Sequence, residues 1–579
     1  MTGAGIVNGL VALCFSLMSA VASASDWSDF GNGYANQRFS PLDQIDRGSV
    51  SKLVPAWIFQ SGTIGPIQAQ PAVVDGALVL TLPGNEVVKI DGATGELLWR
   101  YRHIPRNDNP RNRGTNRGAT VRDGTVYHAT NDGRLIALGL ETGTVVWDRM
   151  IAVPLPEELA SLSPEKGEAL TESVGSLAAK MAPVAFDDMV VVGTTFAGYG
   201  IYYNLGSGVR EGRPPGLDAF RGKRGFLAAF DAKTGAERWR WYTTKQESWE
   251  GTFSATTPDG FTLPRNTEAE RESAPTLRDA NLRGGSSTWM TPAYDGKLGL
   301  LFVGTGNASP NDVPSLRPGD NLYANSLVAL DAETGEVRWH YQQVPQDVWG
   351  YDVASAPVLF EVTRDDARID AVGVAGKTGW FYAHNRETGE LLFKSDPLVP
   401  QKQMFSAPTP EGITISPGSF GGASWSPTSY DPRTGWLFVP AIHMPTRFVK
   451  RVWEGGGPRR EFILTELDEK AQRFGTLSAV DTRGSGRIRW QVKTEEPLIG
   501  GVLATAGDLV FMGEADGTFS AFDAGDGKRL WGFFCGAGVN APPMSYAVDG
   551  RQYVAVAASG HPYVGRSKGD ALIAFALPR

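Results

Sequence analysis

Residues 328–339, VALDAETGEVRW, carry the pattern that decides the fold, because it recurs along the chain. An apolar pair precedes Asp, usually a Thr-Gly dipeptide follows, and a large aromatic residue comes four positions after the Gly. The Asp side chain can accept hydrogen bonds from the turn backbone, the Gly can adopt a positive φ, and the aromatic ring offers an apolar face to a neighbouring unit. Each copy therefore predicts a strand, a tight turn and a second strand. Further copies end at Trp99, Trp147, Trp239, Phe393, Trp490 and Trp531.

These seven copies predict a repeat architecture made of β-sheet. Short β-rich segments bounded by glycine lie between them, for example MVVVGTT at residues 189–195. The segment ALIAFALPR, residues 571–579, resembles one more strand, which can complete a blade begun near the N-terminus and remove exposed sheet edges. We therefore expect an all-β fold, an eight-bladed β-propeller of four-stranded antiparallel blades. An unrelated solenoid is the alternative, and the matching character of the two chain ends disfavours it.

The propeller is also expected to carry long loop insertions, at residues 154–180, 199–224, 246–283 and 447–474. Residues 156–181 alternate acids and alanines and predict a short helix within the first insertion. Loops of this length in compact domains are usually functional or disordered. One hypothesis is that the insertions cover one end of the propeller and shape a substrate entrance. The other is that they are surface decoration.

The composition excludes some classes of partner. The chain has 579 residues, 41% of them hydrophobic, and a formal net charge of -8. A negative charge disfavours binding to nucleic acid or to anionic membranes, which both select basic surfaces. No Gly-x-Gly-x-x-Gly follows a strand and opens a crossover helix, so the sequence does not predict a nicotinamide site. There is also no Cys-x-x-Cys-His motif, so this chain carries no covalently attached c-type haem.

The first 24 residues are expected to be a signal peptide. They are apolar from Ile6 onward and end in Ala-Ser-Ala, a small-x-small cleavage pattern, although no Lys or Arg precedes the apolar run. An uncleaved anchor or a buried N-terminal helix is the alternative. Residues 25–579 then form a single propeller domain with no further apolar run long enough to span a bilayer. These features predict an exported, periplasmic protein whose mature chain has Cys535 as its one cysteine.

Three long stretches are similar to one family in the same order along the chain. They are WSDFGNGYANQRFSPLDQIDRGSVSKLVPAW at 27–57, LATAGDLVFMGEADG at 503–517 and GVNAPPMSYAVDGRQYVAVA at 538–557. They resemble the alcohol dehydrogenases that depend on pyrroloquinoline quinone (PQQ), and the resemblance covers essentially the whole mature chain. PQQ is a flat ortho-quinone with three carboxylates, and in this family a calcium or lanthanide ion polarises it. The cofactor carries the hydride chemistry, and the protein supplies orientation and electrostatics.

The resemblance implies a set of cofactor-site residues. Trp289 matches the ring on which the quinone stacks, and Ser287 matches a nearby hydroxyl ligand. Arg117 matches the partner of a PQQ carboxylate, and Lys377 matches the cation that hydrogen-bonds the quinone oxygens. Asn307 matches an amide ligand of the metal. Taken singly, each residue is better explained as core or as a surface charge, but the five together, in family order, predict a PQQ site.

The catalytic position departs from the family pattern. In the segment PQDVWGYDV, Gly350 stands where the family has its catalytic Asp, and Asp352 lies two residues further on. Residues two apart in an extended strand project to the same side, so Asp352 can reach the metal and act as the base. The alternative is that the base is absent and that Asp352 has a structural role.

Other positions of the pocket also differ. The family's metal-ligating Glu aligns with Gly198, directly after Ala197, and the same alignment places Thr195 and Ala197 at the cofactor. Gln68 and Ser424 replace a cofactor-contacting Glu and Asn. Arg111 and Asn112 replace adjacent cysteines that lie above PQQ in the family. Ile499 and His561 replace aromatic residues that narrow the entrance in methanol-oxidising members.

The resemblance therefore predicts a periplasmic quinoprotein that oxidises an alcohol, larger than methanol, to the carbonyl compound. Asp352 takes the hydroxyl proton, and Lys377 with a metal at Asn307 and Asp352 stabilises charge on the quinone oxygen. Electrons then pass to a separate soluble acceptor such as a cytochrome c. The rival hypothesis is a non-catalytic propeller, a scaffold or binding protein that has lost the catalytic Asp.

Overall fold

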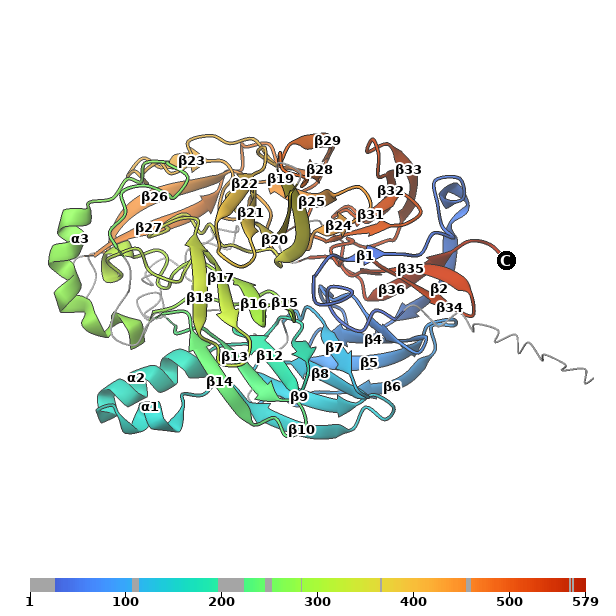
Figure 1. Ribbon diagram of the computed structural model, residues 1–579, viewed down its shortest axis with the longest axis horizontal. Helices are drawn as coiled ribbons and strands as arrows, with labels where there is room; N and C mark the ends of the chain where they lie inside the picture. Colours follow the sequence, from blue (N-terminus) through green and yellow to red (C-terminus); the bar gives the residue numbers. More distant parts are fainter. Residues whose placement is uncertain are drawn as a thin grey trace, which may run out of the picture.

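The computed structural model describes residues 26–106, 114–195, 223–244, 252–282, 284–364, 367–453, 460–561, 564 and 567–579. The expected signal peptide, residues 1–24, lies outside this part of the chain. Within it the fold is all-β, as predicted, with a few short helices (Figure 1). No described helix is both long and apolar enough to cross a membrane.

Most of the described strands belong to eight sheets of four antiparallel strands. They are sheet 1 (β3 Ala72–Val74, β4 Ala77–Leu82, β5 Glu86–Asp91, β6 Leu97–Tyr101), sheet 2 (β7 Ala119–Arg122, β8 Thr125–Ala129, β9 Arg134–Gly139, β10 Val145–Met150), sheet 3 (β11 Val184–Phe186, β12 Met189–Gly193, β13 Phe226–Asp231, β14 Glu237–Tyr242), sheet 4 (β15 Ala293–Asp295, β16 Leu300–Gly304, β17 Ser326–Asp331, β18 Val337–Gln342), sheet 5 (β19 Val358–Arg364, β20 Ala367–Ala375, β21 Phe381–Asn385, β22 Leu391–Lys394), sheet 6 (β24 Ser429–Asp431, β25 Trp436–His443, β28 Phe474–Asp481, β29 Ile488–Thr494), sheet 7 (β30 Val502–Thr505, β31 Leu509–Gly513, β32 Thr518–Asp523, β33 Arg529–Phe534) and sheet 8 (β34 Met544–Val548, β35 Arg551–Ala558, β36 Ala571–Ala576, β2 Val54–Gln60). Sheet 7 gains a fifth, parallel strand, β1 (Phe39–Ser40), next to β30.

Sheet 8 joins the two ends of the chain. Strand β36 pairs antiparallel with β2, from Val54 opposite Ala576 to Gln60 opposite Ala571. Figure 1 shows the blue β2 beside the red strands of the C-terminal region. The predicted joining of the last strand to a sheet begun near the N-terminus is therefore confirmed.

A tryptophan on the outer strand of nearly every sheet docks on the next sheet. Its indole Nε1–H donates to a backbone carbonyl there, at N···O distances of 2.9–3.1 Å. Sheet 5 has Phe393 at this position, which keeps the ring without the donor. The pairs are Trp57 with Gly92, Trp99 with Leu140, Trp147 with Ala232, Trp239 with Ala332, Trp339 with Arg386, Trp490 with Ala524 and Trp531 with Leu53.

The turn that receives each ring explains the Asp and Gly of the repeat. In sheet 3, Asp231 Oδ1 accepts hydrogen bonds from the backbone N–H groups of Lys233 and Thr234, which closes the turn. Gly235 has a φ of +69°, and a Cβ there would lie 2.7 Å from the ring of Trp147. A side chain at this position would therefore both strain the backbone and displace the tryptophan.

Buried apolar side chains fill the space between successive sheets. Phe302 of sheet 4 packs in one cluster with Val372 of sheet 5, and Phe438 of sheet 6 packs in another with Val510 of sheet 7. One larger cluster joins Phe519 of sheet 7, Phe575 of sheet 8 and Leu80 of sheet 1. The core is thus a series of layers between sheets, as expected when each repeat cannot bury its apolar faces alone.

The insertions form structure of their own, and part of this differs from the prediction of loops. The first contains α1 (Pro156–Ala160) and α2 (Pro164–Gly175), which confirms the predicted helix. The third contains α3 (Thr267–Ser273) and the 3-10 helix η4 (Ala274–Leu282). The fourth is a long hairpin, β26 (Thr446–Trp453) and β27 (Arg460–Leu467), which pairs with β23 (Ile413–Ile415). Its two strands are rich in β-branched and aromatic residues, which favours strands over loops. Shorter 3-10 helices are η1 (Val50–Lys52) and η5 (Pro314–Leu316).

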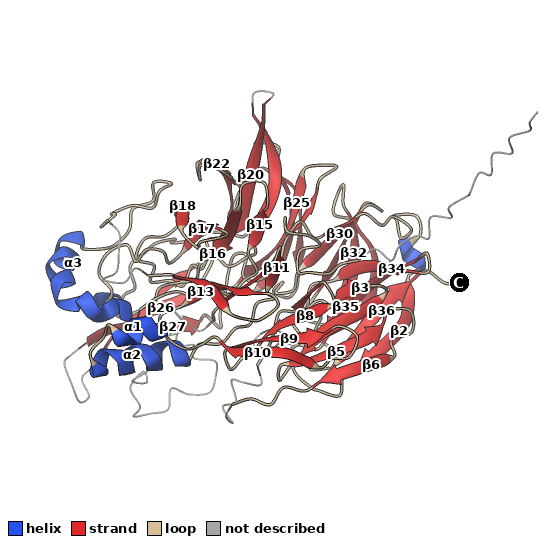
Figure 2. Cartoon of the chain, turned by 60° about the horizontal axis from the view of Figure 1, so that its bottom comes forward, coloured by secondary structure: helices blue, strands red, loops and turns tan. Residues whose placement is uncertain are grey.

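These added elements gather on one side of the molecule. Figures 1 and 2 both place α1, α2 and α3 on the same side as β26 and β27. Glu158 of α1 holds the first insertion to the sheets through a buried ion pair with Arg224, at 2.8 Å. Residues 199–222, most of the second insertion, lie outside the described residues.

We expect Trp147→Phe to lower the free energy of unfolding by about 1–3 kcal/mol, because the Ala232 carbonyl loses its indole donor. Chemical denaturation monitored by circular dichroism measures the effect. The neighbouring change Val146→Ala is the control, since that side chain is 59% exposed and should alter stability by less than about 0.5 kcal/mol. Equal losses in the two variants would contradict a special role for the docked indole.

Candidate functional site

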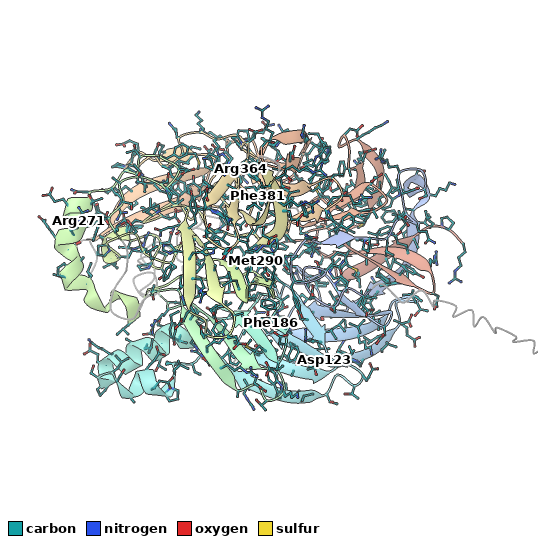
Figure 3. All side chains as sticks on the ribbon, in the orientation of Figure 1. Asp123, Phe186, Arg271, Met290, Arg364 and Phe381 are labelled. Atoms are coloured by element: carbon teal, nitrogen blue, oxygen red, sulfur yellow. The ribbon has the colours of Figure 1, made fainter. Side chains whose placement is uncertain are left out.

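A buried aromatic cluster lies among the sheets at the positions where the sequence predicts a flat cofactor. Trp289 packs there against a cluster that contains Trp425, Phe30 and Ile499, which come from segments far apart in the chain. In Figure 3 the adjacent Met290 lies near the middle of the view, whereas Arg271 and Asp123 lie toward its periphery. The fold therefore places a broad apolar surface in the interior, where loops from several sheets meet.

Arg117 lies over this cluster as a buried cation. Its guanidinium carbon is 4.8 Å from the ring centroid of Trp289 and 5.3 Å from that of Trp425. Its Nε and Nη1 atoms are buried and have no hydrogen-bond partner among the described residues. Burial lowers the pKa of Arg117 from 12.5 to about 9. A buried cation with unused N–H groups favours an anionic ligand, since leaving such groups unpaired is costly.

A second cation approaches the same ring from another sheet. The Nζ atom of Lys377 is 5.8 Å from the Trp289 centroid and 3.3 Å from Oδ2 of Asp352. The backbone N–H of Asn307 donates to Oδ1 of Asp352, at 3.0 Å. Both side chains of the ion pair are buried, at 10% and 9% exposure. The carboxylate is therefore held at both oxygens, close to the aromatic surface.

Glycine at position 306 lets these groups come together. A Cβ there would lie 3.3 Å from Oδ2 of Asp352 and 3.5 Å from Cβ of Ser287. The backbone N–H of Gly306 donates to the carbonyl of Ser287, at 2.8 Å, and that of Lys377 donates to the carbonyl of Asp352, at 3.1 Å. The structure thus brings together five residues expected to gather around one quinone, together with Ser287. The five are Arg117, Trp289, Asn307, Asp352 and Lys377.

Two of the remaining predicted residues lie next to these groups. Ser424 follows Ala423, whose N–H donates to the carbonyl of Gly376 beside Lys377, at 3.0 Å. Thr195 follows Thr194, which exchanges hydrogen bonds with Thr288 beside Trp289. The Oγ1 atom of Thr195 is buried and has no partner among the described residues.

Gln68 is also buried, and its Oε1 has no partner within the described part of the chain. No hydrogen bond or ion pair given by the described residues joins its side chain to the five central residues. Ala197 and Gly198 lie outside the described residues, as do Arg111 and Asn112.

The two positions expected to widen the entrance lie near the same cluster. Ile499 packs in the cluster of Trp289. Burial, and next the nearby charge of Arg117, lower the pKa of His561 from 6.5 to about 4. A neutral imidazole is therefore expected there at neutral pH.

Two residues of the site were not predicted. Trp425 forms the second aromatic contact of Arg117, and the only signal for it in the sequence is its place directly after Ser424. Asp347 accepts hydrogen bonds from the backbone N–H groups of Trp349, Gly350 and Tyr351, on the segment that leads to Asp352. Burial raises the pKa of Asp347 from 3.8 to about 6. A sequence does not show which backbone groups a carboxylate will bind.

The donor set for a metal is small. No group of three or more His, Cys, Asp or Glu side chains that could hold a metal ion occurs within the described residues. Calcium prefers six to eight oxygen ligands that include carboxylates. Asp352 supplies one carboxylate, and Lys377 already engages it.

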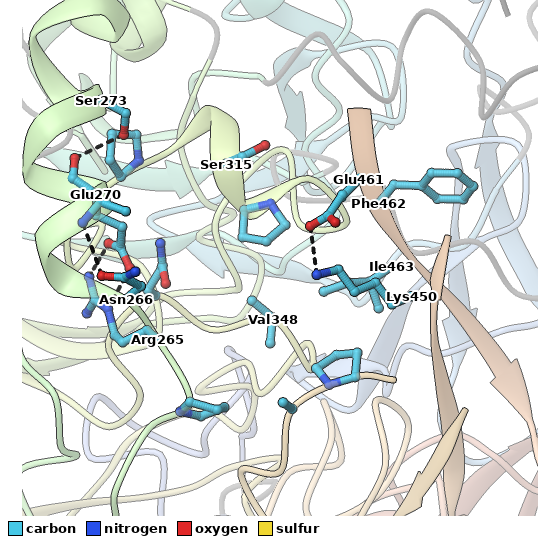
Figure 4. A pocket seen from close by; sticks show the side chains of 17 residues that line it. Arg265, Asn266, Glu270, Ser273, Ser315, Val348, Lys450, Glu461, Phe462 and Ile463 are labelled. Carbon is cyan, nitrogen blue, oxygen red and sulfur yellow. Dashed lines mark hydrogen bonds and ion pairs between the residues drawn. The ribbon is translucent and has the colours of Figure 1, made fainter. Parts of the chain in front are cut away.

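A separate cavity of about 500 Å³ lies on the side of the insertions (Figure 4). Gln346 and Val348, which flank Asp347, line it together with residues of α3 and β27, but none of the predicted site residues does. Its charged side chains are paired within the wall, for example Lys450 with Glu461 at 2.7 Å. This cavity is therefore distinct from the aromatic cluster.

Comparisons with known proteins agree on one family. The family model described as "PQQ: Glucose/ethanol/alcohol dehydrogenase, beta-propeller domain" matches residues 27–404 and 466–554. A quinohemoprotein alcohol dehydrogenase of Comamonas testosteroni is 31% identical over 93% of this chain and 73% of its own length. A quinoprotein alcohol dehydrogenase of Pseudomonas putida is 28% identical over 91% of this chain and 84% of its own length.

Solved structures are similar over nearly the whole chain. The crystal structure of the Comamonas testosteroni quinohemoprotein alcohol dehydrogenase superposes with a TM-score of 0.77 at 29% identity, and it covers 96% of this chain and 80% of that one. A europium-containing methanol dehydrogenase gives a TM-score of 0.74 at 24% identity and covers 96% and 98% of the two chains. At that identity the second likeness concerns the fold alone.

Asp312 allows a test of the electrostatics of this region. It is buried, neither carboxylate oxygen has a described partner, and burial raises its pKa from 3.8 to about 7. The stability that its neutral form provides is present below about pH 4 and is lost as the pH rises toward 7. Asp312→Asn should therefore raise the free energy of unfolding relative to the native protein, by an amount that grows between about pH 4 and 7.

Denaturation titrations at pH 5 and pH 8 check this expectation. Asp123→Asn is the matched control, because that carboxylate is 85% exposed and should leave stability within about 0.5 kcal/mol at both values. A loss of stability in Asp312→Asn at pH 8 would mean that its carboxylate has a stabilising partner.

Proposed function

Because the chain belongs to the PQQ-dependent alcohol dehydrogenase family, we propose that it oxidises an alcohol to the carbonyl compound with PQQ as its cofactor. One observation carries the proposal within this chain. Arg117 is a buried cation over the face of Trp289 with two unused nitrogen atoms, and Lys377 approaches the same ring. This arrangement suits a flat ligand that bears carboxylates.

The proposal includes the shape of the scaffold: the eight sheets are the blades of one closed propeller. The docked aromatic rings support it, because each sheet docks on the next and the series returns to its start. Trp531 of sheet 7 donates to Leu53 beside sheet 8, and Trp57 of sheet 8 donates to Gly92 beside sheet 1. Residues 25–579 then form a single domain.

The residues present fit PQQ. When bound, the cofactor supplies the ortho-quinone that accepts a hydride from the alcohol carbon. Arg117 pairs with a carboxylate of PQQ, and Trp289 provides the stacking face. The remaining predicted contacts are polar or small, at Gln68, Thr195, Ala197, Ser287 and Ser424. Of these, Gln68 and Thr195 have side-chain oxygens without a described partner, which a ligand can satisfy.

In the proposed reaction Asp352 is the base. One of its carboxylate oxygens accepts the hydroxyl proton of the alcohol. The N–H of Asn307 and the ammonium of Lys377 fix the orientation of this carboxylate. Lys377 also lies close enough to Trp289 to donate to an oxygen of a ligand stacked there. Donors fixed in advance, where negative charge develops, are usually the largest single contribution to catalysis.

A metal ion is part of the prediction, with Asn307 and Asp352 as its protein ligands and calcium or a lanthanide as the ion. The described donors do not fit a complete site for such an ion, because Asp352 is the one carboxylate among the predicted ligands and Lys377 engages it. No step of the proposed reaction is therefore assigned to a metal.

The pocket walls indicate the class of substrate. Ile499 and His561 stand where aromatic residues narrow the entrance in methanol-oxidising members, so a roomier pocket for an alcohol larger than methanol is proposed. The electrons leave to a separate soluble acceptor such as a cytochrome c, in the periplasm.

We expect the purified protein to bind PQQ and then to reduce a dye acceptor in the presence of an alcohol. Quenching of tryptophan fluorescence measures binding, and dye reduction across a panel of primary and secondary alcohols, with Ca²⁺ or La³⁺, measures turnover. Binding without dye reduction under any of these conditions would favour the rival hypothesis of a non-catalytic binding protein. Failure to bind PQQ would reject the site itself.

Arg117→Gln should weaken PQQ binding by roughly 10–100-fold, because a charge-assisted contact to a carboxylate is lost. Fluorescence titration gives the affinity. Arg338→Gln is the control, since the side chain of Arg338 is 58% exposed on the outer strand of sheet 4, and its affinity should equal that of the native protein. Equal affinities in all three proteins would remove Arg117 from the site.

Asp352→Ala should lower turnover by at least about 100-fold, the usual contribution of a general base. PQQ binding should persist, because Arg117 and Trp289 are unchanged. Turnover equal to that of the native enzyme would exclude Asp352 as the base and would support the alternative that its role is structural.

A further inference from the structure

We propose that Asp347 is a positioning residue that holds the segment carrying Asp352, so that the base faces the aromatic surface. This inference rests on the proposed function. Asp347 lies five residues before Asp352, and the hydrogen bonds of its carboxylate among the described residues go to residues outside the aromatic cluster. Its action is therefore indirect, through the backbone between the two acids.

Most of the hydrogen bonds to the carboxylate of Asp347 come from the backbone of residues 349–351. Oδ1 accepts the N–H of Trp349 at 3.0 Å, and Oδ2 accepts the N–H groups of Gly350 and Tyr351, both at 2.9 Å. The side-chain amide of Asn325 also donates to Oδ2, at 3.2 Å. Three consecutive backbone N–H groups can reach one carboxylate only if the chain turns tightly around it. Asp347 thus fixes the backbone conformation that immediately precedes Asp352.

Asn325 connects this turn to the other side of the site. Its amide also donates to the carbonyl of Tyr351, at 2.8 Å, and its backbone N–H donates to the carbonyl of Gly306, at 2.9 Å. The next residue, Asn307, donates its N–H to Oδ1 of Asp352, at 3.0 Å. A ring of hydrogen bonds therefore runs from Asp347 through Asn325 and Gly306–Asn307 to Asp352. The bonds of Asp347 and Asn325 hold the backbone that precedes Asp352, and the N–H of Asn307 holds its carboxylate.

Gly350 belongs to the same turn. Its φ is +80°, a conformation that L-residues adopt at a cost of about 1 kcal/mol. Its N–H is one of the three backbone groups that donate a hydrogen bond to the carboxylate of Asp347. The glycine that replaces the family's acid therefore does more than remove a side chain. It permits the turn around Asp347, and the first carboxylate after the turn is that of Asp352.

The guanidinium of Arg317 does not neutralise this carboxylate through a direct hydrogen bond. Arg317 is buried and donates to the backbone carbonyls of Pro310, Asn311 and Asp347, and to the side chain of Asn321. Arg317 therefore holds the backbone at these three residues. The hydrogen bonds to the carboxylate of Asp347 come from the turn and from Asn325. Burying a carboxylate costs free energy, and the hydrogen bonds from the turn and from Asn325 offset part of that cost.

The test compares Asp347→Ala and Asp347→Asn with the native enzyme loaded with PQQ. In Asp347→Ala we expect kcat to fall by roughly 10–100-fold, since a small misplacement of a reacting group has that effect. KM and the PQQ affinity should stay within about 3-fold, because the aromatic surface and Arg117 are untouched. Asp347→Asn keeps one acceptor oxygen and should give an intermediate kcat. Asp312→Asn, another buried acid, is the control and should keep the native kcat.

Hydrogen exchange separates this inference from the proposed function, because it does not require turnover. Amides of residues 349–352 should exchange faster in Asp347→Ala, whereas those of the distant strand β9 should not change. If the alanine variant does not fold, Asn325→Gly provides the same test. It keeps the positive φ of 52° at that position and removes the amide that joins Asp347 to Tyr351. Unchanged exchange in the segment, or a native kcat in the folded, PQQ-loaded variant, would overturn the inference. Absence of turnover in the native protein alone would reject only the proposed function.

Discussion

The docking of an aromatic ring from each sheet on a turn of the next is the interaction on which the rest of the structure depends. A four-stranded sheet of this size cannot bury both faces by itself, so each sheet needs a neighbour at a defined distance and angle. The ring provides the apolar contact, and the indole N–H fixes the register through one carbonyl, as Trp239 does with Ala332. The turn must leave room for the ring, which is why glycine stands at positions such as 335, where a Cβ would lie 2.5 Å from Trp239.

Because the sheets follow one another in a regular series, loops that belong to different sheets meet at one place. Arg117 precedes sheet 2, Trp289 precedes sheet 4, Asp352 precedes sheet 5 and Lys377 lies inside it, yet all four meet at one aromatic surface. Their charges are arranged unequally. Lys377 is balanced by Asp352, whereas Arg117 lies over two tryptophans with two nitrogen atoms unused. The excess positive charge therefore lies where a carboxylated ligand is expected.

Much of this was predictable from the sequence, for physical reasons that particular residues show. The Asp and Gly of each turn are local signals, so the strands and turns around Asp231 and Gly235 could be expected from a few neighbouring residues. Trp57 was not recognised as a docking ring, because no Asp-Thr-Gly turn precedes it and its strand is completed from the other end of the chain. The hairpin β26–β27 was predicted as a loop because the repeat pattern is absent from it.

The residues of the site also differ in whether a sequence signal marks them. Arg117, Trp289 and Lys377 could be located because they stand in segments with a family pattern, and the structure brings them together. Trp425 and Asp347 could not be assigned a role in this way. The role of Asp347 lies in hydrogen bonds to three main-chain groups, and main-chain groups are the same in every sequence. The sequence argument placed Asp352 by the period of two of an extended strand. That reason was wrong, because residues 350–352 lie in no described strand and Gly350 has a φ of +80°.

The pairing of β2 with β36 affects the order in which the protein folds during synthesis. The two strands are more than 500 residues apart in the chain, as Val54 opposite Ala576 shows, so this contact has one of the longest loops to close. During synthesis β2 emerges early and remains without its neighbour until the final segment has been made. Its alternating apolar side chains, with Trp57 and Phe59 on one side, are an unprotected edge throughout that interval. Assembly of the last sheet is thus a late event, and a nascent chain that stops short of β36 leaves that edge open to association with other chains.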